Sequence, residues 1–223
     1  MQVRRKSRKS PSLPEEEKHQ PITELLQANN ISWKSTDLVL VGDGSGTGGW
    51  TKGCGWSVLV YEKSSRPFFL CGGMNVGSIN FAELFPYVHA VSWFDQARDG
   101  CKFRKAGKLC NVVVFSDNRE VTTVGNALMS GDKHWTEVPD HRFDWEALRF
   151  FARRGYSFKF VWIPRDTIQE HVVVDNLSRQ SRIAVENVSS IDGDTEAIDE
   201  RGKGRRQMKR AYKYQRKIVT KST

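Results

Sequence analysis

Four acidic residues stand where apolar runs predict strand ends or helix starts. Asp43 and Asp117 each follow a β-rich run, Glu83 falls in the first turn of a predicted helix, and Asp175 opens the last one. The carboxyl ends of parallel strands meet at one edge of an open α/β sheet, so we expect these acids to gather there. Clustered carboxylates repel one another and favour a hard cation such as Mg²⁺ or Mn²⁺. Two such ions ~3.5–4 Å apart are typical of phosphodiester hydrolysis.

Each acid also has a purely structural explanation. Asp43 precedes a glycine and suits a turn, and Asn80-x-x-Glu83 fits a helix capping box with Asn80 as the N-cap. Asp117 could cap the helix that follows it, and Asp175 could be a surface residue. For any single acid we favour the structural explanation, but four of them at these element ends favour a site.

The apolar pattern predicts elements that would position these acids. Strands are expected at 37–41, 55–61, 68–71 (with 74–76 as a further part), 111–115 and 156–163, and helices at 81–94, 121–128, 144–153 and 174–186, with a short helix beginning at Pro21. Three leading strands followed by αβ alternation predict an α/β fold. Its five-stranded mixed sheet has three antiparallel strands, then two parallel ones, with helices on both faces.

Charge and composition divide the chain of 223 residues, which carries a net charge of +9. Segment 1–30 is predicted to be basic and largely disordered, 36–186 to be the folded domain, and 187–223 to be an acidic linker followed by a basic tail. Basic tails favour a polyanion partner, most often nucleic acid, although a solubilising or targeting role stays open.

The end of the chain has its own pattern. Residues 203–219 place apolar side chains at helical spacing among many basic ones, which predicts a basic amphipathic helix. Such a helix would lie on nucleic acid, on a membrane surface or on a protein partner. A disordered tail resembling a nuclear-localisation signal is the equal alternative.

Several classes of protein do not fit. The longest apolar runs have four residues, such as Val112–Phe115, so no transmembrane helix is expected, and the basic start lacks the apolar segment of a secretory signal. The four cysteines have neither zinc-site spacing nor a nearby histidine, and we expect free thiols in a reducing compartment. We therefore expect an intracellular protein, cytoplasmic or nuclear, that binds no membrane.

The motifs around the acids resemble the ribonuclease H family, type 1 or reverse-transcriptase-like, over residues 36–186. The resemblance rests on five segments in order. Val41–Ser45 resembles the family's D-G-S, Ser78–Leu84 its T-N-N-x-x-E-L, and Phe115–Asn118 its T-D-S. Asp144–Leu148 resembles the start of its third helix, and Val174–Arg179 its A-D-x-L-A-R. Each segment alone is weak, but all of them in this order are fairly specific.

The resemblance implies a two-Mg²⁺ site. Asp43 would bridge both ions, Glu83 and Asp117 would complete one position, and Asp175 would help to hold the other; Mn²⁺ could substitute. One ion would lower the pKa of the attacking water, and the other would stabilise the leaving 3′ oxygen.

The resemblance also implies substrate contacts and a partner. Residues expected to bind substrate are Gly44, Ser45, Asn80, Asn118 and Arg165. The partner would be an RNA–DNA hybrid, in which 2′-hydroxyls distinguish the RNA strand. We expect a monomer, and the tail leaves room for a protein partner.

The sequence departs from the family pattern at three positions. Arg165 stands where a loop histidine is common; it cannot act as a base but can hold a phosphate. His171 stands where related sequences tend to have Asn, and it would take an auxiliary role only if the loop folds back. Pro86 falls inside the helix that carries Glu83 and is expected to kink it.

The glycine-rich stretch after Asp43 matches G-x-G-x-x-G, but a strand follows it, so we interpret it as a hairpin connection rather than a dinucleotide site.

Three functions follow from this pattern. The first is an endonuclease that cuts the RNA strand of RNA–DNA hybrids with two Mg²⁺ ions. The second is a catalytically weak module of the same fold that binds nucleic acid or protein, and the third is a DNA-directed nuclease or recombinase.

Overall fold

The fold is taken from a computed structural model. It describes residues 20–47, 53–63, 66–75, 77–97, 108–132, 142–165 and 168–191. The basic start, the end of the glycine-rich loop, Asp99-Gly100, most of the polar loop after Ser130 and the whole of 192–223 lie outside the described residues. The predictions made for those segments stay predictions.

One mixed sheet of five strands forms the centre of the domain that begins at Thr36. Its strands are β1 (Leu38–Gly46), β2 (Cys54–Glu62), β3 (Phe68–Met74), β4 (Cys110–Ser116) and β5 (Tyr156–Trp162). Their order is β3-β2-β1-β4-β5; β1–β2 and β2–β3 are antiparallel, whereas β1–β4 and β4–β5 are parallel. This arrangement confirms the predicted fold class.

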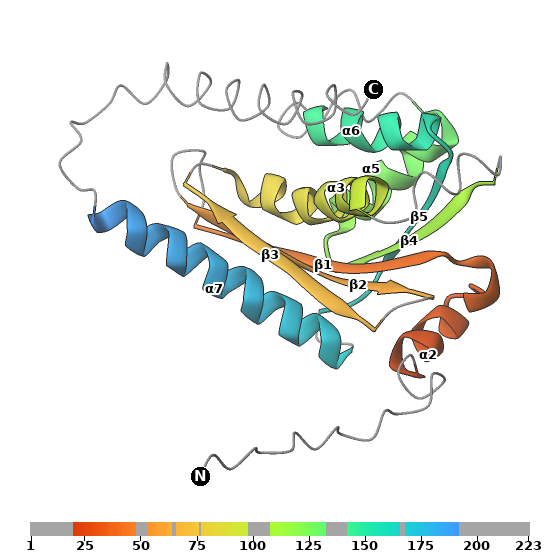
Figure 1. The fold of residues 1–223 in the computed structure, drawn as a ribbon, viewed down its shortest axis with the longest axis horizontal. Helices are drawn as coiled ribbons and strands as arrows, with labels where there is room; N and C mark the ends of the chain where they lie inside the picture. Colours follow the sequence, from red (N-terminus) through yellow and green to blue (C-terminus); the bar gives the residue numbers. More distant parts are fainter. Residues whose placement is uncertain are drawn as a thin grey trace, which may run out of the picture. The chain divides into compact units, whose positions relative to one another are not determined.

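Helices cover both faces of this sheet, as predicted (Figure 1). α7 (Gln169–Ile191) lies across β1, β2 and β3 on one face. On the other face α3 (Ile79–Ala97) packs on β1 and β2, α5 (Arg119–Ser130) packs on β5, and α6 (Arg142–Arg153) packs against α3, α5 and β5. Among the described helices, none has the length and apolar character that crossing a bilayer requires.

The residues before Thr36 form a separate unit. It contains α2 (Gln20–Ala28), the short helix expected near Pro21, and a 3₁₀ turn, η1 (Trp33–Ser35). Ile22, Leu25 and Leu26 lie on one stripe of α2 and are buried.

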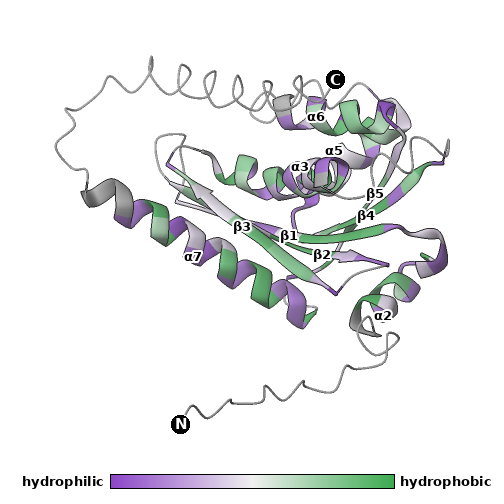
Figure 2. Cartoon of the chain, in the orientation of Figure 1, coloured by the Kyte–Doolittle hydropathy of each residue, from purple (hydrophilic) through white to green (hydrophobic). Residues whose placement is uncertain are grey.

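The core lies mainly between the sheet and α3, α5 and α6. Figure 2 shows apolar residues along the central strands and mixed colours on α7. Every residue of β2 is buried, because helices cover both of its faces. Burying an aliphatic or aromatic side chain of this kind contributes about 1.5–3 kcal/mol, so the core fixes which strands are neighbours. Cys54, Cys71 and Cys110 are free thiols.

Two strand predictions need correction. β1 does not end at Val41 but continues to Gly46, because pairing with β2 is unbroken through Asp43 and Ser57. Asp43 therefore lies inside the strand rather than after it. β3 continues without a break from Phe68 to Met74, so its expected end at Cys71 is too early and Asn75 does not belong to it, while Val76 lies outside the described residues.

Two helix predictions also need correction. α7 begins at Gln169, five residues before the expected Val174. α3 begins at Ile79, and the Ser78 side chain accepts a 3.1 Å hydrogen bond from the backbone N–H of Phe81, so Ser78 and not Asn80 caps this helix. α3 runs on through Pro86 as one helix.

Candidate functional site

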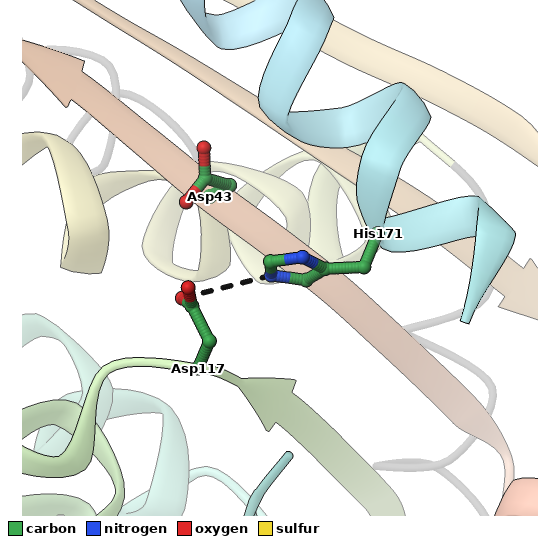
Figure 3. Close-up of side chains that lie close together, drawn as sticks. All are labelled: Asp43, Asp117 and His171. Carbon is green, nitrogen blue, oxygen red and sulfur yellow. Dashed lines mark ion pairs between the residues drawn. The ribbon is translucent and has the colours of Figure 1, made fainter. Parts of the chain in front are cut away.

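Three side chains from distant parts of the chain point toward one another at the edge of the sheet (Figure 3). Asp43 comes from β1, Asp117 directly follows β4, and His171 lies in the first turns of α7. Each offers a ligand atom such that these atoms all lie within 4.8 Å of one another. His171 Nε2 is 3.6 Å from Asp117 Oδ1. The expected meeting of Asp43 with Asp117 is therefore observed.

The close approach of α3 to β1 brings Glu83 to this edge. A β carbon on Gly44 would lie 2.7 Å from the carbonyl oxygen of Ala82 and closer still to other backbone atoms of α3. Only glycine permits this contact, and the Gly44 backbone hydrogen-bonds to Glu83. Pro86 lacks the N–H that the Ala82 carbonyl would otherwise receive in the helix.

Tyr87 ties the two strands together beneath the site. Its hydroxyl lies 2.9 Å from the carbonyl oxygens of both Gly42 and Phe115, on β1 and β4. Its ring fills the space next to Gly42, where a β carbon would lie 2.7 Å from a ring carbon. The side chain is fully buried, so these contacts fix the strand ends that carry Asp43 and Asp117.

Contacts with β2 fix the position of α7. A β carbon on Gly55 would collide with the backbone of Ser178 and Arg182, and the Ser57 hydroxyl donates to the carbonyl of Val174. Residues 171, 175 and 178 share one helix face because they are four and three positions apart. From this face the Ser178 hydroxyl donates a 2.9 Å hydrogen bond to Oδ2 of Asp43.

Asp43 and Glu83 are buried acids with incomplete hydrogen bonding. Oδ1 of Asp43 and Oε2 of Glu83 have no hydrogen-bond partner among the described residues. Burial, together with the charges of Asp117 and Asp175, raises the pKa of Asp43 to about 6, although Ser178 opposes the shift. Burial and the nearby Asp43 and Asp117 raise the pKa of Glu83 well above its ordinary value. His171 lowers the pKa of Asp43 and Arg165 lowers that of Glu83, but burial outweighs both, so the ionised form of each carboxyl is disfavoured.

Asp117 has cationic neighbours instead. Arg165 Nε donates a 3.0 Å hydrogen bond to its Oδ2, and His171 faces its Oδ1. Burial alone would raise the pKa of Asp117, but His171 and Arg165 outweigh it and lower this pKa. Burial would lower the pKa of His171, but Asp117 and Asp43 raise it. Trp162 Nε1 also donates a 3.0 Å hydrogen bond to the backbone carbonyl of Asp117.

Asp175 lies at the margin of the site. Its carboxylate accepts a 2.9 Å hydrogen bond from Arg179, one helical turn further on. It still contributes to the raised pKa of Asp43. Among the described residues, the tight cluster contains Asp43, Asp117 and His171, with Glu83 and Asp175 beside it.

The residues expected to bind substrate lie in different settings. Asn118 caps α5, because its side-chain oxygen accepts hydrogen bonds from Glu120 and Val121. A shallow hollow in the surface has a lining of Asn80, Leu84, Asn118, Glu120, Val121 and Trp145. Gly44 is buried against α3, and the Ser45 hydroxyl accepts a 3.1 Å hydrogen bond from Arg182. Arg165 is the most accessible of the set, with 63% of its side chain exposed.

Four residues of the site carried no prediction from sequence. Ser178 stands three positions after Asp175, and Tyr87 stands four after Glu83, so helical spacing from the predicted acids is the signal that could have found them. Trp162 and Arg119 pair by stacking, with the guanidinium carbon 4.6 Å from the ring centroid. They come from β5 and α5, and their pairing has no local sequence signal.

The donor set fits a divalent cation. Two buried carboxylate oxygens, on Asp43 and Glu83, have no hydrogen-bond partner among the described residues. Both lie near further carboxylate oxygens that could also bind a metal ion. Leaving such groups unpaired costs free energy that a cation bound there would offset.

Comparison with known proteins finds a similar fold in solved structures. No protein-family model and no curated protein matches the sequence. Among solved structures, LC11 ribonuclease H1, isolated from compost by a metagenomic approach, is 16% identical; the match covers 67% of this chain and 97% of that one, with a TM-score of 0.50. The N-terminal ribonuclease H domain of a Mycobacterium tuberculosis protein is 19% identical, over 70% and 99% of the two chains, with a TM-score of 0.48. LC11 ribonuclease H1 in complex with an RNA/DNA hybrid is 14% identical, over 66% and 98%, with a TM-score of 0.48.

The sheet order and the covering helices define an α/β protein with its acids at the edge where β1 and β4 lie side by side. The chain has the ribonuclease H fold.

Proposed function

We propose that this chain is a metal-dependent nuclease that hydrolyses the RNA strand of RNA–DNA hybrids. One observation carries the proposal: Asp43 and Glu83 are buried beside Asp117, and each keeps a carboxylate oxygen without a hydrogen-bond partner among the described residues. Burying acids without a compensating positive charge or hydrogen bond lowers the stability of a fold, so a purely structural role does not explain them. Perturbed carboxylates gathered at one sheet edge are typical of a functional site.

Asp43, Glu83, Asp117 and Asp175 would hold two Mg²⁺ ions, with Mn²⁺ as a substitute. Divalent ions supply Lewis acidity, which activates water and neutralises charge on the phosphate. Ser178 keeps Asp43 oriented by donating to its Oδ2. Tyr87 holds the strand ends so that Asp43 and Asp117 stay adjacent.

The substrate would lie over the exposed basic and aromatic side chains next to the cluster. Arg165 is long and exposed, so its guanidinium can bind a phosphate when it releases Asp117. Trp162, which is 40% exposed, and Arg119 offer a stacked surface to a sugar or base. Asn80 and Asn118 line the nearby hollow, where amide groups could bind 2′-hydroxyls.

The substrate class comes from the fold relative LC11 ribonuclease H1. The basic segments at the two ends of the sequence fit the same class. Because they carry most of the net charge of +9, they would add a salt-sensitive hold on the phosphate backbone.

The test is cleavage of a labelled RNA–DNA hybrid in Mg²⁺, beside RNA–RNA, DNA–DNA and single-strand controls. D117N should reduce hybrid cleavage on the order of 100-fold or more, because it removes charge from the cation site. D132N, which changes an exposed acid after α5, is the matched control and should cut normally. Failure of the wild-type protein to cut the hybrid in either Mg²⁺ or Mn²⁺ would reject the proposal.

A second candidate is a binding module without catalysis. Arg165 and His171 favour it, because they face both oxygens of Asp117 and neutralise this acid without a metal ion. The two candidates differ in their response to metal. A nuclease should gain thermal stability from millimolar Mg²⁺. A binding module should bind the hybrid, but Mg²⁺ should leave the melting temperature of the protein unchanged.

A further inference from the structure

His171 is a buried imidazole without hydrogen-bond partners in the acidic cluster. Its side chain has no exposed surface, and neither ring nitrogen has a hydrogen-bond partner among the described residues. Asp117 Oδ1 lies 3.6 Å from Nε2, beyond ordinary hydrogen-bond length. A fully buried polar ring that makes no hydrogen bond requires a physical reason.

The position of the ring suggests that reason. Figure 3 shows the imidazole directed at the two carboxylates, and one of its nitrogens lies within 4.8 Å of a ligand atom on each. These distances leave room for one ion between the three side chains, as in a site where each ligand atom stands slightly over 2 Å from the metal.

Ligand chemistry then limits the ion. Carboxylate oxygens accept Mg²⁺ and Mn²⁺ alike, whereas an imidazole nitrogen favours first-row transition metals over Mg²⁺. Two carboxylates with one imidazole therefore form a different donor set from four carboxylates. Mn²⁺ suits both parts of this set, because it accepts oxygen-rich sites and also binds imidazole.

We propose that His171 is a direct metal ligand, which forms with Asp43 and Asp117 a site that prefers a transition-metal ion such as Mn²⁺ to Mg²⁺. The inference rests on the proposed function only in treating the cluster as a cation site. It assigns His171 a role that an auxiliary residue outside the metal sphere does not have.

The alternative is that His171 only positions Asp117 through their ion pair. Such a residue would support every cation equally, because it would act on a carboxylate that all of them share. Replacing it would weaken Mg²⁺ and Mn²⁺ binding by the same factor. The ratio of the two affinities therefore separates a ligand from a positioning residue.

The experiment measures Mn²⁺ binding to the full chain by electron paramagnetic resonance, with Mg²⁺ as competitor. We expect H171N to lose on the order of tenfold or more in Mn²⁺ affinity, with a much smaller change for Mg²⁺, since even outer-shell changes cost about 10–100-fold. H89N is the matched control. His89 lies on α3 against Trp56 and Phe85, so its replacement should leave Mn²⁺ binding unchanged.

A second measurement needs no variant. Pulsed resonance of Mn²⁺ bound to the wild-type protein should detect a directly coordinated nitrogen, and this coupling should disappear in H171N. Absence of nitrogen coupling in the wild type, or an equal loss of Mg²⁺ and Mn²⁺ affinity in H171N, would overturn the proposal.

These outcomes are independent of hybrid cleavage. If the wild type cuts hybrids but shows no nitrogen coupling, the nuclease proposal stands and the assignment of His171 fails. If nitrogen coupling is present but no nucleic acid is cut, His171 is a ligand in a protein with another function.

Discussion

The hydroxyl of Ser178 donates a 2.9 Å hydrogen bond to Oδ2 of Asp43, which joins α7 to the central strand β1 across 135 positions of sequence. The same hydroxyl lies 2.8 Å from the backbone carbonyl of Asp175 and has one proton to share. The hydroxyl donates this proton to the Asp43 carboxylate rather than to the Asp175 carbonyl when Asp43 is ionised, because charged acceptors make the stronger hydrogen bond. Ser178 thus helps to keep a buried acid in its ionised form.

Replacing this serine should shift the pH range of metal binding. Ser178 lowers the pKa of Asp43, so S178A should raise it further above about 6. A hydrogen bond to a charged group contributes about 1.5–3 kcal/mol, which corresponds to a shift of about one pH unit or more. We expect the pH at which Mg²⁺ begins to raise the melting temperature to increase by that amount. S130A is the control, because the Ser130 hydroxyl donates its hydrogen bond to Ala127 within α5. An unchanged pH midpoint in S178A would contradict the role given to Ser178.

Asp43 itself should make the metal-free protein less stable as pH rises. Its pKa is about 6 in the folded protein and 3.8 as an unperturbed group, so the folded state holds the proton more tightly. This contribution to stability is complete below about pH 4 and is lost as pH rises through about 6. D43N cannot lose a proton at this position. Between pH 4 and pH 7.5 the wild type should therefore lose on the order of 3 kcal/mol relative to D43N, measured by urea unfolding in EDTA.

Mg²⁺ provides the companion measurement. Millimolar Mg²⁺ should restore the wild type at pH 7.5 and leave D43N nearly unaffected, because the ion binds the ionised carboxylate. E24Q, a change at an exposed acid of α2, should behave like the wild type throughout. If the unfolding free energies of the wild type and D43N change in parallel with pH, Asp43 is not the group responsible for the loss of stability.

The framework of the site could be predicted from the sequence because it depends on local patterns. Apolar runs at β1 and β4 identify two buried strands, and a parallel pair must place the residues at their carboxyl ends side by side. The meeting of Asp43 with Asp117 follows from topology alone. The approach of Glu83 follows as well, because α3 must cross back over β1 to reach β4.

The part played by α7 could not be predicted in the same way. Val172, Val173 and Val174 are β-branched and lower local helix propensity, so the local pattern does not show that the helix begins as early as Gln169. Tertiary contacts outweigh this preference, since His171 is buried against the sheet edge and Ser57 donates to Val174. Only the longer helix places residues 171, 175 and 178 on one face. The Arg165–Asp117 ion pair, across 48 positions, depends on the path of a turn that no local pattern encodes.

The close contact between β1 and α3 gives a prediction about glycine. A β carbon at Gly44 would overlap the backbone of Ala82 and Glu83, which cannot move without displacing the helix. A β carbon at Gly46 would meet its nearest atom, the Cα of Ile79, at 3.2 Å, which a small shift relieves. We expect G44A to destabilise the protein by about 1–3 kcal/mol or more and to abolish Mg²⁺-dependent stabilisation, whereas G46A costs much less. Thermal melts with and without Mg²⁺ compare the two, and equal costs would mean that α3 does not lie against Gly44.

Tyr87 allows stability and function to be separated. Y87F removes the hydroxyl that lies 2.9 Å from both Gly42 and Phe115 and leaves buried carbonyl groups without that donor. Tyr156 offers a matched control, because its hydroxyl donates a 2.9 Å hydrogen bond to Asp95, away from the acidic cluster. Each change should cost about 1–2 kcal/mol of unfolding free energy. Only Y87F should also weaken Mg²⁺ binding and hybrid cleavage, because only Tyr87 holds together the strand ends that carry Asp43 and Asp117. Equal metal affinity in Y87F and Y156F would reduce Tyr87 to an ordinary core residue.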